Sequence, residues 1–181
     1  MEASAESPGL MTLYTIGHST REISELIEDL ESFGIRTVVD VRTVSGSRRY
    51  PQFNREALEQ ALAAAGIAYR HSKGLGGLRK PLKDSVNGAW RNESFRGFAD
   101  YMQSEAFAAA LAELEGEAAS GGPVAILCAE AVPWRCHRSL IADALSVRGH
   151  TVMHIMAPGK ANRHKVTPWA RVEGLQITYP G

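Results

Sequence analysis

The stretch VAILCAEAVPWRCHRSLIADAL, residues 124–145, decides the fold. It begins with the apolar run 124–128, which is expected of a strand covered on both faces. It ends in an apolar stripe at helical spacing that consists of Leu140, Ile141, Ala144 and Leu145. A strand, a polar loop and a helix in this order predict one half of a β–α–β unit.

The same alternation continues outward along the chain. Further strands are predicted at 13–17, 36–42, 67–71 and 151–156. Helices are predicted after Ser19, which forms a capping box with Glu22, and after Asn54, which suits an N-cap. Two consecutive helices are expected over 94–120, and the chain after Ala157 is expected to be mostly irregular, with a short strand at 175–179. The fold class is therefore α/β, a mostly parallel sheet flanked by helices in a Rossmann-like three-layer arrangement.

Composition limits the possible functions. A chain of 181 residues with 44% hydrophobic and 22% charged residues is typical of a globular protein with one core. Lys plus Arg equals Asp plus Glu, so only a local basic patch can support nucleic-acid binding. We expect residues 1–11 to be a disordered tail and residues 12–181 to form a single α/β domain.

The sequence also indicates a compartment. The first ten residues, MEASAESPGL, lack the apolar region of a signal peptide. No stretch approaches the roughly 20 apolar residues of a membrane helix, so no membrane partner is expected. Two cysteines without a secretory signal favour a cytoplasmic protein with free thiols.

Polar and titratable residues gather where the predicted strands end. Ligands of such sheets bind beyond the carboxyl ends of the strands. We assign candidate catalytic roles to His18, Asp40, Cys128 and Glu130. Candidate anion- or ligand-binding roles go to Ser19, Arg42, Ser47, Arg48, Asn54, Gly76, Gly77, Arg135, His137 and Arg138. The loop over 72–94 is longer than compact domains usually tolerate and is a further functional candidate.

Each of these residues also has a purely structural interpretation. Ser19 can simply cap a helix, and Asp40 can pair with Arg42 in a surface salt bridge worth about 0–1 kcal/mol. Cys128 ends a buried strand, and burial is the usual fate of an unreactive cysteine. Arg138 and Glu130 can form a buried structural pair.

Three functional interpretations compete for residues 128–139. A metal site has suitable ligand types in Cys128, Glu130, Cys136 and His137. Neighbouring residues of a helix, however, point about 100° apart, so Cys136 and His137 are not expected to share an ion, and no metal is predicted. A nucleophilic Cys128 resembles rhodanese-like and cysteine-phosphatase loops, but six residues separate it from Arg135, where the Cys-x5-Arg pattern allows five.

The third interpretation is an anion or nucleotide pocket. A helix N-terminus near 133–135 would supply backbone amides, and Arg138, Arg42, Arg48 and His18 would supply positive charge. Glu130 and Asp40 could then bind a base or sugar, or act as a general base. The expected partner is a small phosphorylated or anionic ligand, and the reaction would be a hydrolysis or a transfer. The sequence names no cofactor and fixes no oligomeric state.

A nucleic-acid-binding or nucleic-acid-modifying module is the alternative. Its support is the segment 74–102, in which five basic residues alternate with three aromatic residues. These are Arg79, Lys80, Lys83, Arg91 and Arg96, with Trp90, Phe95 and Phe98. Phosphate contacts and base stacking need this combination, although a solvated loop followed by a helix with core-facing aromatics explains it equally well.

The assembled motifs resemble one family. They are TIGHST (15–20), DVR (40–42), SR with PQFN (47–54), GLGGLR (74–79), WRNESFRGFADYM (90–102) and CAEAVPWRCHRSLIADAL (128–145). Together they are similar to the bacterial and archaeal domain-of-unknown-function family 488. The resemblance implies an α/β domain and a site shared by these motifs, but no activity. Ser45 and Gly46 stand where close relatives have a proline and a basic residue, which would loosen this loop and weaken a phosphate contact.

Overall fold

A computed structural model describes residues 9–43 and 48–181. Ser45, Gly46 and Ser47 and the first eight residues of the expected tail lie outside the described part. The central sheet has the strand order β3-β2-β4-β1-β5-β6. Its strands are β1 (Thr12–Gly17), β2 (Thr37–Asp40), β3 (Ala68–His71), β4 (Val124–Cys128), β5 (Thr151–Ala157) and β6 (Lys160–Arg163). The first five are parallel, whereas β6 is antiparallel to β5.

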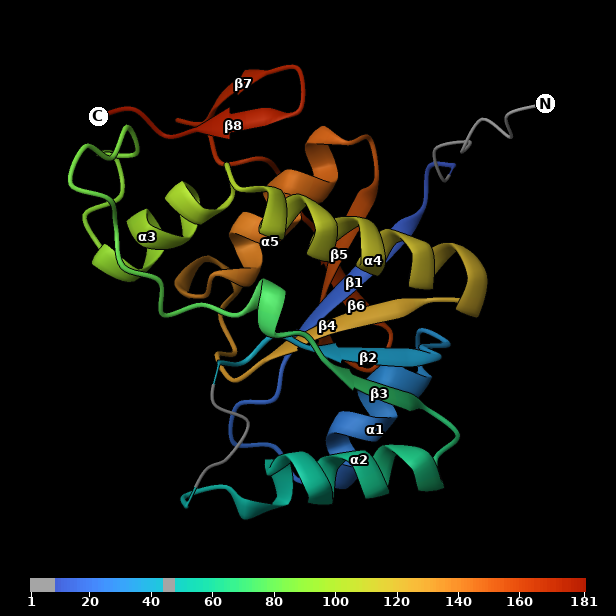
Figure 1. The fold of residues 1–181 in the computed structure, drawn as a ribbon. Helices are drawn as coiled ribbons and strands as arrows, with labels where there is room; N and C mark the ends of the chain where they lie inside the picture. Colours follow the sequence, from blue (N-terminus) through green and yellow to red (C-terminus); the bar gives the residue numbers. More distant parts are fainter. Residues whose placement is uncertain (1–8, 44–47) are drawn as a thin grey trace.

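Helices cover both faces of this sheet (Figure 1). One face carries α1 (Ile23–Glu31) and α2 (Arg55–Ala64). The other carries α3 (Glu93–Tyr101), α4 (Glu105–Gly121) and α5 (Arg138–Val147). Each face has its own apolar core, one around Leu26, Leu58 and Ile16, the other around Phe98 and Leu140. The predicted three-layer α/β fold is thus confirmed.

Two segments differ from the expected secondary structure near the helix starts. The N-cap of α1 is Glu22, while Ser19 has a positive φ of 49° and lies in the turn before it, so the capping box is wrong. The turn is held by the Ser19 amide, which donates to the carbonyl of Ala129 at 2.9 Å. Asn54 is the N-cap residue of α2 as expected, although its side chain makes no capping hydrogen bond.

The end of the chain is more regular than its sequence suggests. β6 follows β5 through a tight turn in which Gly159 has a φ of 69°. A separate hairpin consists of β7 (Arg171–Glu173) and β8 (Gln176–Thr178), the second of which was expected. Residues 160–163 escaped prediction because KANR has no apolar alternation and pairs only at the sheet edge. No helix among residues 9–43 and 48–181 is long and apolar enough to span a membrane.

Candidate functional site

The strand register brings the ends of three strands together. Gly17 at the end of β1 is paired with Cys128 at the end of β4, and Asp40 of β2 is paired with Leu127. The helix after β1 lies on one face of the sheet and the helix after β4 on the other (Figure 1). Neighbouring strands whose connections diverge in this way leave a crevice at their carboxyl ends, where ligands of α/β sheets bind.

A pocket of about 350 Å³ lies at this edge, and we call it the cysteine pocket. It draws on the exit loops of β2 and β4, the glycine-rich loop after β3 and the first turn of α3. Its lining residues are Arg42, Thr43, Gly77, Leu78, Ser94, Phe95, Cys128, Ala129, Glu130, Arg135, Cys136 and His137. The volume is within the range of about 300–1,000 Å³ that is usual for small-molecule sites.

Cys128, Cys136 and His137 form a cluster within this pocket. Their sulfur atoms and one imidazole nitrogen all lie within 4.8 Å of one another, and Cys136 Sγ is 3.8 Å from His137 Nδ1. The expectation that Cys136 and His137 must point apart is therefore wrong. The reason is that α5 begins only at Arg138: Cys136 is extended, at φ −132° and ψ 145°, after the 3₁₀ turn Pro133–Arg135. The helix N-terminus expected near 133–135 is therefore not the start of α5, and residues 133–135 form a separate 3₁₀ turn.

Two backbone carbonyls fix the protonation of the His137 ring. Its Nε2 lies 3.1 Å from the carbonyl oxygen of Val41 and 3.0 Å from that of Leu75. Both oxygens can only accept, so Nε2 carries the hydrogen and Nδ1 faces the cysteines with its lone pair or a second proton. Gly77 lets the loop approach, because an added Cβ would lie 3.0 Å from the imidazole ring.

The two thiols are not equivalent. A hydrogen bond from Cys136 lowers the pKa of Cys128 well below its usual value, with further help from His137 and Arg138 and against the opposing effect of burial. The same hydrogen bond, together with burial, raises the pKa of Cys136. The lowered pKa of Cys128, which is 9% exposed, favours its thiolate form, and Cys136 is the hydrogen-bond donor that stabilises this form.

The three donors also fit a soft metal ion in number and type. A tetrahedral zinc site takes cysteine sulfur and histidine nitrogen, and a catalytic one leaves a fourth position open. The bonds from His137 Nε2 to two carbonyls match the outer support that metal-bound histidines usually have. The residues present therefore allow such an ion, contrary to the geometric reason given against it from sequence.

Arg42 and Asp40 form a buried unit beneath the pocket. Asp40 is fully buried and accepts hydrogen bonds from the amide, Nε and Nη2 of Arg42 at 3.0, 2.9 and 2.8 Å. The hydroxyl of Tyr69 donates to the same carboxylate at 2.6 Å, which, after burial, raises the pKa of that phenol. The expected pairing is confirmed, but it is buried rather than on the surface.

His18 lies behind this unit. Burial lowers the pKa of His18, so the ring is neutral near pH 7. Its Nδ1 is 2.9 Å from the carbonyl of Ser19, and its Nε2 is 3.3 Å from Nη1 of Arg42. The ring stacks on Phe53 with centroids 4.2 Å apart. With both nitrogens occupied, His18 orients Arg42 and does not line the cysteine pocket.

Arg138 supports the exit loop of β4 from below. It is 1% exposed, and its guanidinium donates to the carbonyls of Glu130 and Ala131 and to the hydroxyl of Thr15. It contacts the backbone of Glu130 rather than the carboxylate. That carboxylate is exposed and accepts from the amide of Val132 at 3.1 Å. Arg138 therefore shapes the loop, while Glu130 reaches the pocket.

Comparison with known proteins identifies the family of this chain. The family model "Domain of unknown function DUF488" matches residues 22–145, more than half of the chain. The chain belongs to the DUF488 family. No curated protein and no solved structure matches it. The resemblance proposed from the motifs is thus confirmed.

The DUF488 segment contains every residue that lines the cysteine pocket. It does not contain β1 or His18, which support the pocket from outside the matched range.

Arg135 is exposed at the pocket, and among the described residues none pairs with its guanidinium. Arg48 is exposed and Asn54 is half-buried, and neither residue lines the cysteine pocket. Gly76 does not line the pocket either; a Cβ added to Gly76 would lie 3.3 Å from the Thr43 hydroxyl.

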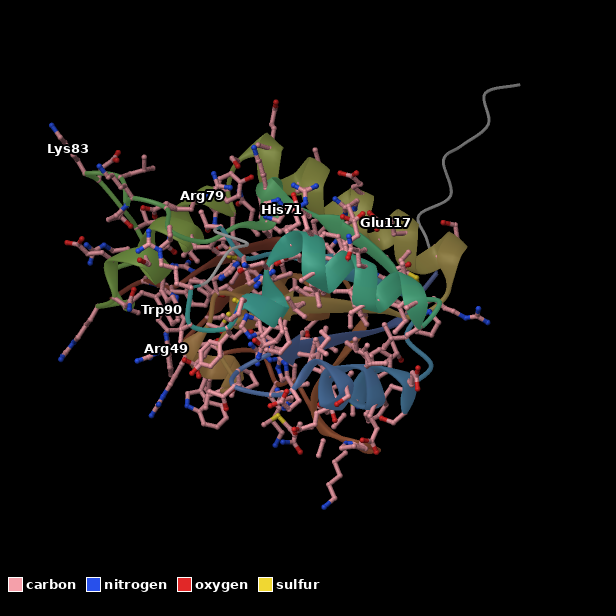
Figure 2. All side chains as sticks on the ribbon, turned by 90° about the horizontal axis from the view of Figure 1, so that it is seen from below. Arg49, His71, Arg79, Lys83, Trp90 and Glu117 are labelled. Carbon is pink, nitrogen blue, oxygen red and sulfur yellow. The ribbon has the colours of Figure 1, made fainter. Side chains whose placement is uncertain are left out.

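In this DUF488 protein the aromatic residues of segment 74–102 mostly face inward. Phe98 is fully buried, and the Arg79 guanidinium lies 3.6 Å over the Tyr101 ring. Trp90 packs edge-on against Phe95, with ring centroids 5.3 Å apart. Figure 2 shows Lys83 reaching outward while Trp90 lies against the body. Lys80, Lys83 and Arg91 are thus exposed, whereas Arg79 and Arg96 are half-buried and donate to backbone carbonyls. Of the rings needed for stacking, Phe98 is buried and Trp90 and Phe95 are half-buried.

Sequence reasoning did not single out four lining residues: Thr43, Leu78, Ser94 and Ala129. Phe95, the fifth lining residue without an assigned role in this pocket, was named only for base stacking. Leu78 is 70% exposed and has a positive φ of 55°, which is unusual for a residue with a side chain. The only available signal was that Leu78, Ser94 and Ala129 stand inside the motifs 74–79, 90–102 and 128–145, and that Thr43 directly follows the motif 40–42. Chemically neutral residues of this kind reveal a pocket only once the chain is folded.

Proposed function

We propose that the cysteine pocket is the active site of a thiol-dependent hydrolase or transferase that acts on a small anionic molecule, such as a nucleotide or another phosphorylated compound. The observation that carries this proposal is the cluster itself. Cys128 has a lowered pKa and a hydrogen-bonding thiol beside it, and the His137 ring has only Nδ1 free for proton transfer. A low-pKa cysteine beside an oriented histidine is the usual activated thiol nucleophile.

The reaction divides into two balanced steps. In the first, the Cys128 thiolate bonds to an acyl or phosphoryl centre, the bond to the leaving group breaks, and protonated His137 gives that group its Nδ1 proton. In the second, water or another acceptor loses a proton to His137 and attacks the enzyme-bound group, which frees the thiolate. Exposed Arg135 supplies positive charge for the anion.

The two free cysteines, Cys128 and Cys136, also indicate a cellular compartment. Reduced, closely spaced cysteines persist in a reducing compartment. We infer a cytoplasmic protein on this ground.

Alkylation by iodoacetamide tests the nucleophile. Because the pKa of Cys128 is lowered, its thiolate is present at lower pH than that of a free cysteine. We expect half-maximal reaction at a pH below the value near 8.5 of an ordinary thiol. Mass spectrometry should place the first label on Cys128, since the pKa of Cys136 is raised.

Matched variants sharpen this test. His137→Gln should move the alkylation midpoint upward, whereas His71→Gln should not, because the His71 ring bonds to the carbonyl of Arg42 outside the cluster. Phosphate should slow alkylation of the wild type but not of Arg135→Ala. A midpoint at or above that of a free thiol, or first labelling of Cys136, would contradict the proposal.

A zinc site is the second candidate, favoured by the three donors within 4.8 Å. Bound zinc would block alkylation of both cysteines until a chelator is added. Protein purified without chelator should therefore be assayed for metal and alkylated with and without EDTA. Stoichiometric zinc, with reaction only after EDTA, would replace the thiol proposal by a metal-centred one.

The nucleic-acid alternative draws support from exposed Lys80, Lys83 and Arg91, but the burial of Phe98 and the half-burial of Trp90 and Phe95 favour the small-molecule site. If it holds, oligonucleotide affinity should fall steeply between about 50 and 200 mM salt.

A further inference from the structure

A second pocket lies on the other side of the exit loop of β4, and we call it the tryptophan pocket. Its volume is about 410 Å³. It is lined by Trp90, Pro133, Trp134, Ser139, His154, Met156, Asn162, Arg163, His164, Lys165, Thr167, Pro168 and Trp169. The chain has three tryptophans, and all three are among these residues. Neither the family match nor the proposed thiol chemistry accounts for this concentration.

The indole rings offer flat surfaces to a ligand. Trp134 is 71% and Trp169 is 51% exposed, although large aromatic side chains are normally covered. Trp90 is held edge-on against Trp169, with centroids 5.5 Å apart. Such rings stack with planar heteroaromatic groups, an interaction that does not depend on which base is bound.

The rim of the pocket is positively charged. Arg163 at the end of β6 and Lys165 just after it are both exposed, and among the described residues no carboxylate pairs with either. The facing loop contributes no acidic residue to the pocket. An anionic group attached to the planar part of a ligand would meet these two side chains.

The pocket wall contains a histidine pair held by hydrogen bonds. Asp143 is fully buried and accepts from His164 Nε2 at 2.7 Å and from Thr167 and Tyr179. His164 Nδ1 lies 2.9 Å from His154 Nε2, and His154 Nδ1 lies 2.5 Å from the Thr15 hydroxyl. Burial, together with His164 and Arg138, lowers the pKa of His154 to about 3. These hydrogen bonds fix the orientation of both rings in the wall.

From these features we propose that the tryptophan pocket binds the heteroaromatic base of a nucleotide, with Trp134 and Trp169 stacking on the base and Arg163 and Lys165 contacting the phosphate. Because Trp134 and Arg135 are consecutive and line different pockets, the nucleotide is bound beside the cysteine pocket. The site stands independently of the thiol chemistry.

Intrinsic fluorescence is the natural probe, since every tryptophan of the chain reports on this pocket. Titration with AMP and with UMP should quench the emission to saturation at millimolar concentration or below, after correction against N-acetyltryptophanamide for absorbed light. Adenosine and ribose 5-phosphate, tested alone, should each bind at least about tenfold more weakly than AMP, because each lacks one half of the recognised chemistry.

Variants assign the contacts. Trp134→Ala should weaken AMP at least about fivefold, the lower end of the loss expected for one stacking ring. Lys165→Ala should weaken AMP but leave adenosine unchanged. Lys160→Ala, at the start of β6 and outside the pocket, should change neither. Calorimetry replaces fluorescence for the tryptophan variant, and circular dichroism checks that each variant is folded.

The outcomes separate cleanly. No saturable quenching by either nucleotide, equal binding of adenosine and AMP, or unchanged affinity in both Trp134→Ala and Lys165→Ala would overturn the proposal. An eight-residue oligonucleotide that competes with AMP and binds more tightly would identify the nucleotide as part of a single strand. Cys128→Ser should leave nucleotide binding intact, so loss of thiol reactivity and loss of the tryptophan site are distinguishable.

Discussion

Asp40→Ala is expected to lower the free energy of unfolding by about 3–5 kcal/mol, the usual cost of breaking a buried ion pair from one side. The carboxylate accepts three hydrogen bonds from Arg42 and one from Tyr69. Removing it leaves the Arg42 guanidinium buried without a counter-charge. Urea unfolding followed by circular dichroism measures the change.

Two further variants test the cause of this loss. Asp84→Ala removes an exposed carboxylate from the long loop and should change stability by no more than about 0.5 kcal/mol. Asp40→Ala combined with Arg42→Leu removes both charges and should recover part of the loss. A single variant as stable as the wild type would mean that the Asp40–Arg42 unit does not hold the site together.

Gly17→Ala is expected to cost at least about 2 kcal/mol, near the upper range for overpacking, because backbone must move. A Cβ at this position would overlap the backbone carbonyl of Glu130. The same carbonyl accepts from Arg138, so the displaced loop would also lose that contact. The variant should therefore unfold at lower urea concentration and alkylate Cys128 with an altered pH midpoint.

Gly116→Ala provides the matched control with the opposite sign. Gly116 lies within α4, and nothing lies within 4 Å of the position of an added Cβ. Alanine is favoured over glycine in a helix by up to about 1 kcal/mol. If Gly116→Ala is stabilised and Gly17→Ala is destabilised, the close approach of the Glu130 carbonyl, and not the loss of a glycine as such, causes the loss of stability at Gly17. Equal stability of the two variants would contradict this explanation.

The periodicity of apolar residues predicted the strands and helices, which depend on neighbours along the chain. The apolar run 124–128 is β4, and the stripe from Leu140 onward is α5. The rule for α/β sheets then placed Arg42, Cys128 and Glu130 at one edge, where all three line the pocket. These results follow from local pattern and topology, which a single sequence contains.

The details that failed depend on backbone geometry. Assigning Cys136 and His137 to one helix missed the extended residue before α5, which brings both side chains to Cys128. Arg138 was expected at an anion, yet its partners are loop carbonyls that only the folded chain positions. The tryptophan pocket was invisible because it requires the pairing of β5 with β6, which the sequence of β6 does not signal.

The antiparallel strand β6 has a further consequence, for self-association. It forms one edge of the sheet, where unpaired backbone groups invite a strand from another molecule. Its exposed residues include Lys160 and Arg163, and charges on an edge strand oppose such pairing. Arg163, which would contact a phosphate, thus also opposes edge-to-edge aggregation. A neutral residue at this position would therefore weaken ligand binding and increase the tendency of the sheet edge to pair with another molecule.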